Sequence, residues 1–179
     1  MRFALVALVV VSLVSFGCGS SAQPQAAPET LTALPASALP GLESTTGPVG
    51  VSELEADLGS SVSVEGFVRG VERVFQGESH RFDRVVSRSL EFEDADAAAA
   101  YVTLLRDHVA DLYGVGTNAQ PLESDGRKGI LVDAASCACH RAEPTLAAAV
   151  SSGPRVAYLE VNGGGARPAA VEALLERAP

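Results

Sequence analysis

The chain has 179 residues, with 22 acidic and 13 basic side chains and a formal net charge of −9. This length suits a single domain with a real hydrophobic core behind a short leader. The acidic balance argues against nucleic acid as a partner and against attachment to anionic lipid through basic patches. The chain has no tryptophan, which argues against a stacking platform for sugars or bases.

The first 17 residues have the form of an export signal. Arg2 precedes an apolar run that ends at Gly17, and this run is shorter than the roughly 20 residues that a membrane-spanning helix requires. Cys18 follows directly. The segment resembles the signal peptide of a bacterial lipoprotein, with residues 15–18 in the place of the lipobox.

This resemblance implies that residues 1–17 are removed and that Cys18 becomes a lipidated N-terminus, modified with a diacylglyceryl group and fatty acids such as palmitate. Each buried CH₂ of such chains contributes about 0.8 kcal/mol to membrane binding. Phe16 departs from the small residue that is usual two positions before the cysteine. The alternative is an ordinary secreted protein that is cleaved near Ser20, Ser21 or Ala22 and loses Cys18. Both interpretations predict an exported product, and lipidation places it at the extracytoplasmic face of the cell membrane.

Residues 18–48 are rich in Pro, Ala and Ser and contain few charges. Such a composition cannot form a core and predicts a spacer between the lipidated cysteine and the folded domain. The segment 34–40 leaves a second possibility open, an extended strap that docks onto the domain. We expect a single domain over residues 49–179.

The first half of this domain shows helix and strand signals in turn. Ser52 and Glu55 match a capping box, which predicts a helix over 52–58. Gly66 and Gly70 interrupt a β-rich segment over 62–75, so a bent or bulged strand is expected there. A clearer strand is predicted over 82–92.

The second half begins with an alanine-rich helix over 94–113, capped by Asp94 or Asp96. Asp125-Gly126 predicts a turn between two strands, a hairpin joins 145–150 to 156–161, and a last helix covers 168–177. The resulting order, α-β-β-α-β-β-β-β-α, predicts an α+β fold. We expect a mostly antiparallel sheet with the two main helices packed on one face.

Cys137, Cys139 and His140 form the only local cluster of reactive side chains in the sequence. An oxidising compartment favours a disulfide between the two cysteines, although the Cys-x-Cys spacing makes that bond geometrically tight. A bridge between two molecules and reduced thiols remain open. Two thiolates and an imidazole also suit Cu(I) or Zn²⁺, so these three residues are a candidate metal or thiol-redox site.

Two charged patterns are weaker candidates. An acidic patch precedes the alanine-rich helix, but its spacing does not match a calcium loop, and acids at such positions usually cap and solvate. The patch consists of Glu91, Glu93, Asp94 and Asp96. Four arginines alternate along the first two predicted strands, where they either line one sheet face and bind an anion or pair with nearby glutamates. They are Arg69, Arg73, Arg84 and Arg88.

The sequence contains no Gly-x-Ser-x-Gly motif and no phosphate-binding loop, so we assign no catalytic residue and no cofactor. The signal, the spacer and the compact α+β domain resemble the small, mostly uncharacterised lipoproteins of high-GC Gram-positive bacteria. This resemblance implies a membrane-anchored, non-catalytic binding or interaction module of the cell envelope, whose partner is an envelope protein or a small ligand. The alternative is soft-metal handling or thiol redox chemistry at Cys137, Cys139 and His140.

Overall fold

The computed structural model describes residues 31–59, 61–77, 81–114, 117–134 and 144–178. Seven strands form one sheet in the order β1-β2-β3-β7-β6-β5-β4, and every neighbouring pair is antiparallel. The prediction of an α+β fold with an antiparallel sheet is therefore confirmed. The strands are β1 (Glu43–Val49), β2 (Phe67–Gln76), β3 (Arg84–Phe92), β4 (Asn118–Ser124), β5 (Arg127–Asp133), β6 (Thr145–Ser152) and β7 (Arg155–Asn162).

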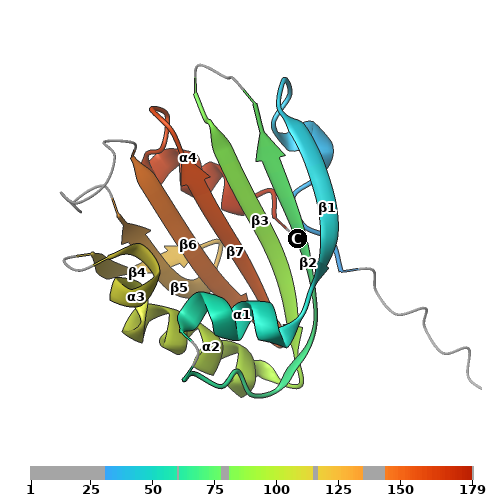
Figure 1. Cartoon of the computed structure of the whole chain (residues 1–179), viewed down its shortest axis with the longest axis vertical. Helices are drawn as coiled ribbons and strands as arrows, with labels where there is room; N and C mark the ends of the chain where they lie inside the picture. The colour runs from blue at the N-terminus through green and yellow to red at the C-terminus, as the bar shows by residue number, and fades with distance from the viewer. Residues whose placement is uncertain (1–30, 60, 78–80, 115–116, 135–143, 179) are drawn as a thin grey trace, which may run out of the picture.

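Four α-helices and one short 3₁₀ helix accompany the sheet in the described part of the chain (Figure 1). They are η1 (Ala36–Ala38), α1 (Val51–Leu58), α2 (Ala95–Asp107), α3 (Val109–Tyr113) and α4 (Pro168–Leu175). None of the helices in the described ranges is long and apolar enough to cross a membrane.

The predicted helix over 94–113 is present but divided. Asp94 caps it, since its carboxylate accepts a hydrogen bond from the Ala97 amide at 2.8 Å. His108 interrupts the helix between α2 and α3 with φ −105° and ψ 14°. The alanine run therefore predicted the helix correctly, and only the break was missed.

The predicted capping box of α1 is wrong by two residues. The helix begins after Gly50, and the Glu53 carboxylate accepts a hydrogen bond from the Gly50 amide at 2.7 Å. Glu55 instead accepts a hydrogen bond from the Val64 amide at 3.1 Å. Glu55 thus holds the segment after the helix, a contact that the local pattern does not reveal.

The two predicted hairpins are confirmed. Asp125 and Gly126 have φ angles of 53° and 72° and join β4 to β5 as a two-residue turn. Positive φ at both central positions suits the twist of antiparallel strands. β6 and β7 pair along their whole length from Thr145–Asn162 to Ser152–Arg155.

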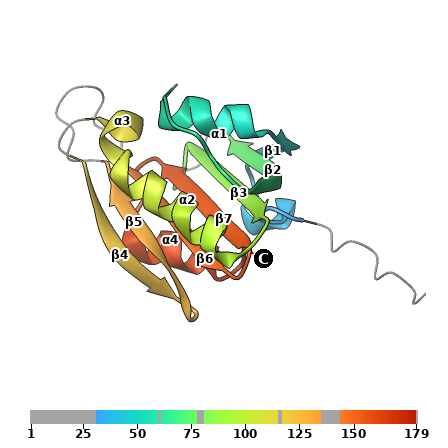
Figure 2. The same cartoon turned by 90° about the horizontal axis from the view of Figure 1, so that it is seen from below.

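Helices cover both faces of the sheet, so the expectation that the two main helices share one face is wrong. β6 and β7 alternate between two hydrophobic clusters: Ala147 and Tyr158 pack in one cluster with α1, α2 and α3, while Ala148 and Leu159 pack in the other with α4. Figures 1 and 2 show α1 and α4 on opposite sides. The reason is that these strands are apolar on both faces, and each face must be covered. We call the faces the α2 side and the α4 side.

The expected spacer boundary at residue 48 is too late, because the segment before it is part of the domain. Leu34 is fully buried in the α4-side cluster, together with Ala38 and Leu39. Residues 43–49 form the edge strand β1. Pro48 is compatible with a strand at this edge position, where no further strand needs its missing N–H. We call residues 31–42 the strap.

The prediction of a bulged strand over 62–75 is confirmed in part. The register of β2 against β3 shifts between Phe67 and Arg69, which is the expected irregularity. The strand begins only at Phe67, and residues 62–66 lie outside it. This segment lies beside α2 instead, and it forms one wall of the site described next.

Candidate functional site

Several residues singled out by the sequence lie outside the described residues. These are Cys18, Cys137, Cys139 and His140, so the disulfide, metal and lipidation predictions remain predictions. Within the described ranges, no three His, Cys, Asp or Glu side chains are grouped closely enough to hold a metal ion.

The four arginines do not line one face of the sheet, so that alternative is wrong. Arg69 pairs with Glu91 on the α4 side, and Arg73 donates to the Leu34 carbonyl of the strap at 2.6 Å. Arg84 and Arg88 project from the α2 side, because they occupy even positions of β3. The other alternative, pairing with glutamates, is confirmed for the pair Arg69–Glu91 and for Arg88 with Glu72.

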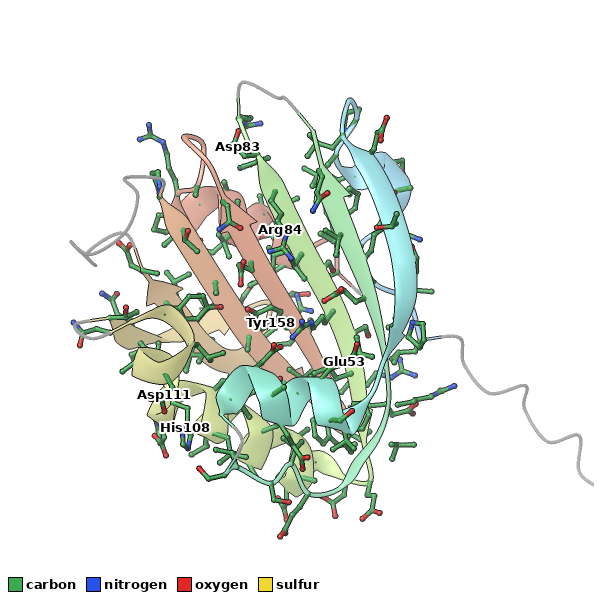
Figure 3. The ribbon with its side chains drawn as sticks, viewed as in Figure 1. Glu53, Asp83, Arg84, His108, Asp111 and Tyr158 are labelled. Atoms are coloured by element: carbon green, nitrogen blue, oxygen red, sulfur yellow. The ribbon has the colours of Figure 1, made fainter. Side chains whose placement is uncertain are left out.

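A polar cluster lies on the α2 side around two tyrosines. The hydroxyls of Tyr113 and Tyr158 are 2.5 Å apart, and both lie within 3.2 Å of Glu160 Oε2. Arg84 donates to the other carboxylate oxygen of Glu160 at 3.2 Å. Figure 3 shows Arg84 and Tyr158 on the same sheet face as α1. The cluster joins α3 to β7 and β3.

Burial raises the pKa of both tyrosines above their ordinary range. Desolvation is the largest cause for Tyr113, and the negative charge of Glu160 adds to it. Desolvation also dominates for Tyr158, where Tyr113 and Glu160 raise the pKa further. Both hydroxyls are therefore proton donors at neutral pH, and neither is a ready general base.

Arg88 anchors the same face of the sheet. Its side chain is only 17% exposed, donates to Glu72 at 2.7 Å and pairs with Asp57 of α1. The guanidinium carbon lies 5.5 Å from the centre of the Tyr158 ring. Burial lowers the pKa of Arg88, but its hydrogen bonds to Asp57 and Glu72 outweigh burial and raise the pKa overall. These groups satisfy one another, which is the pattern of a structural network.

A wide, open groove lies elsewhere on the α2 side. It has a volume of about 870 Å³ and runs between residues 63–66 and the outer face of α2. We call it the acidic groove. Its lining consists of Ser63, Val64, Glu65, Gly66, Glu93, Asp94, Asp96, Ala97, Ala99, Ala100, Tyr101, Thr103 and Leu104.

The groove depends on a close approach between residues 63–66 and the start of α2. Gly66 has a φ angle of 69°, and a Cβ at this position would lie 2.7 Å from the Ala97 Cβ. The Glu93 amide donates to the Gly66 carbonyl at 2.8 Å. Only glycine permits this approach without a shift of the helix.

Four carboxylates surround an apolar floor in the acidic groove. Glu65, Glu93, Asp94 and Asp96 are all exposed, and the described residues that line the groove include no lysine or arginine. The acidic patch of the sequence is thus divided, because Glu91 points to the α4 side and pairs with Arg69. Sequence reasoning missed Glu65, which lies far from the patch in the chain, and the surface on which the carboxylates meet.

No protein-family model matches this chain, and a search of curated proteins finds no significant relative.

Proposed function

We propose that this protein is a lipid-anchored lipoprotein of the cell envelope whose folded domain is a non-catalytic binding module. The acidic groove is the observation that carries the proposal, since it combines an open apolar floor with four exposed carboxylates. The occupant that fits this surface is a basic segment of a protein partner, with at least one apolar side chain among its lysines or arginines.

Charge and apolar burial have different parts in this interaction. An exposed ion pair contributes only about 0.2–1 kcal/mol to binding. The four carboxylates of the groove therefore mainly orient the partner and raise its association rate. Burial of an apolar side chain against Ala97, Ala100 and Leu104 supplies affinity, at about 25 cal/mol for each Å² removed from water. The affinity for the partner should therefore decrease as the salt concentration rises, but binding should not be lost.

The position of the strap supports a partner near the membrane. Leu34 is fully buried, so the connection from Cys18 to the domain is shorter than the sequence suggested. Even a fully extended chain of that length spans only about 50 Å at about 3.4 Å per residue. The domain and its groove would work close to the lipid surface, on the extracytoplasmic side.

A peptide titration tests the binding proposal. The probe is a labelled ten-residue peptide of alternating lysine and leucine, compared with its glutamate–leucine counterpart by fluorescence anisotropy at two salt concentrations. We expect binding of the basic peptide only, and an affinity several-fold lower in the Glu93→Gln/Asp96→Asn variant, which keeps the Asp94 cap. The Glu172→Gln/Glu176→Gln variant, within and directly after α4, removes the same charge and is the matched control.

Equal losses in the two double variants would show a general charge effect and refute the groove as the binding surface. Anchoring is tested separately, by the intact mass of the protein from its native membrane. A diacylglyceryl adduct on Cys18 that is lost in Cys18→Ser is expected. A mature chain that begins after Cys18 without lipid would contradict the anchor and leave the groove proposal intact.

A further inference from the structure

A cavity of about 470 Å³ lies on the α4 side, between the strap and the first two strands of the sheet. The strap and β1 each contribute a threonine to its lining, Thr32 and Thr46. β2 contributes Arg73, and Arg177 reaches the cavity from the segment that follows α4. We call this space the strap cavity. It is separate from the acidic groove, because the two share no lining residue.

The positive charges of Arg73 and Arg177 are not balanced by a carboxylate within the described part of the chain. Arg73 donates to the Thr46 hydroxyl at 2.7 Å and to the Leu34 carbonyl at 2.6 Å. Arg177 donates to the Ala38 carbonyl at 2.9 Å. All three acceptors are neutral, and the ion pairs among the described residues involve neither arginine. Two uncompensated guanidiniums therefore line one cavity.

The contacts of these arginines hold them in place without using all of their donors. A guanidinium has five N–H donors. Arg73 uses two of them, on Thr46 and Leu34, and Arg177 uses one, on Ala38. Thr46 accepts the hydrogen bond from Arg73, so its own hydroxyl proton can be donated to a ligand. Because Arg73 is fixed by two bonds, it loses little conformational freedom when it binds an oxygen.

The charge of the strap cavity is opposite to that of the chain as a whole. The net charge is −9, and the acidic groove on the α2 side has four carboxylates in its lining. The described residues that line the strap cavity include two arginines and no acidic residue. The rest of its wall is mostly apolar and includes Leu31, Ala33 and Val71. A small anion is therefore attracted to this cavity and repelled by the opposite face of the sheet.

We propose that the strap cavity binds a phosphate group. Arg73 and Arg177 supply charge-assisted donors from two walls of the cavity, and Thr46 supplies a neutral donor. A phosphate has more acceptor oxygens than a carboxylate, which suits donors that come from two separate arginines. Free phosphate esters and lipid headgroups both carry this group. The net charge of the chain opposes approach to an anionic lipid surface and so favours a free phosphate ester.

The test uses the chain from position 18 onward, with Cys18→Ser to prevent lipidation. Inorganic phosphate and methyl phosphate are titrated by calorimetry, and co-sedimentation compares phosphatidylglycerol vesicles with phosphatidylcholine vesicles.

Two pairs of variants change the charge inside and outside the cavity. Thr32→Glu adds a carboxylate to the cavity lining at an exposed position. Thr45→Glu adds the same charge on the opposite face of β1 and is its matched control. Arg177→Gln removes a donor from the cavity, and Arg167→Gln removes the same charge at the start of α4, outside the lining. Arg73 is left intact because it also holds the strap. The thermal unfolding midpoint of each variant shows that it is folded.

We expect the soluble phosphates to bind, with an affinity several-fold lower in Thr32→Glu and Arg177→Gln and unchanged in the two controls. Sedimentation with phosphatidylglycerol in excess of phosphatidylcholine, without binding of the soluble ions, identifies a headgroup as the source of the phosphate.

Three results would overturn the proposal. The first is equal affinity in wild type and in folded Thr32→Glu and Arg177→Gln. The second is an equal loss in each variant and its control, which indicates a general charge effect. The third is the absence of binding to every probe. None of these results bears on the acidic groove, since the two sites share no residue.

Discussion

The hydroxyl oxygens of Tyr113 and Tyr158 lie 2.5 Å apart, which joins the end of α3 to a central strand of the sheet. Each hydroxyl also lies near Glu160 Oε2, so two hydroxyl protons are available for three oxygen–oxygen contacts. In one consistent arrangement, Tyr158 donates to Glu160 and Tyr113 donates to Tyr158. This small network fixes α3 on the α2 side and gives the protein a characteristic response to alkaline pH.

Stability should fall as the pH rises above about 10, the ordinary pKa of tyrosine. Burial raises the pKa of Tyr113 and Tyr158 in the folded protein, so the unfolded chain loses these protons first. The unfolded state then binds fewer protons, and the free energy of unfolding decreases by up to about 1.4 kcal/mol per pH unit for each tyrosine.

Urea unfolding at pH 8, 9, 10 and 11 measures this slope. Tyr113→Phe should make the alkaline slope shallower, because one linked proton is removed. A free energy of unfolding that stays constant from pH 9 to pH 11 would contradict the raised pKa values.

Loss of Arg88 should destabilise the domain more than loss of Arg84. Arg88 is 17% exposed and contacts both Glu72 and Asp57, whereas Arg84 is 43% exposed and contacts Glu160. Arg88→Gln leaves two carboxylates without their partner and should cost about 2–3 kcal/mol. Arg84→Gln should cost at most about 1 kcal/mol. Chemical denaturation of both variants provides the comparison, and equal losses would disprove the structural role of Arg88.

The strap should contribute to the stability of the domain. Leu34 is fully buried, and its amide donates to the Ser87 hydroxyl at 3.1 Å. Leu34→Ala should lower the free energy of unfolding by about 2–5 kcal/mol. Leu31→Ala, at a half-buried position of the same strap, is the control and should cost clearly less. If Leu34→Ala leaves both the unfolding midpoint and the protease resistance of the strap unchanged, the strap does not belong to the fold.

Two strand glycines should respond differently to alanine. A Cβ on Gly129 would lie 1.9 Å from the Ala149 carbonyl oxygen of the neighbouring strand, whereas a Cβ on Gly47 meets nothing within 4 Å. Gly129→Ala should therefore cost several kcal/mol or prevent folding, since the backbone of β6 must move. Gly47→Ala should change stability by less than about 0.5 kcal/mol. Thermal unfolding followed by circular dichroism compares the two, and a stable Gly129→Ala protein would refute the close packing of β5 and β6.

The elements whose signals are local could be predicted from the amino-acid sequence. The alanine run and Asp94 predicted α2, and Asp125-Gly126 predicted the turn between β4 and β5. These predictions succeeded because helix propensity, capping and positive φ act within a few residues. The composition of residues 43–48 led to a wrong prediction, since an edge strand can be as polar as a spacer.

Which side chains meet across the sheet depends on long-range packing and could not be predicted. The helix α4 lies opposite α2 because β6 and β7 are apolar on both faces, a property of the whole sheet. Glu65 joins the acidic groove only because Gly66 lets its segment approach Ala97. Five strands bring together Arg69, Glu91, Arg155, Ser152 and Arg127, and the alignment of these strands depends on long-range register. A shift of one residue in any strand would reverse the faces of its side chains, so the one-dimensional pattern could not place Arg69, Arg127 and Arg155 on the same side.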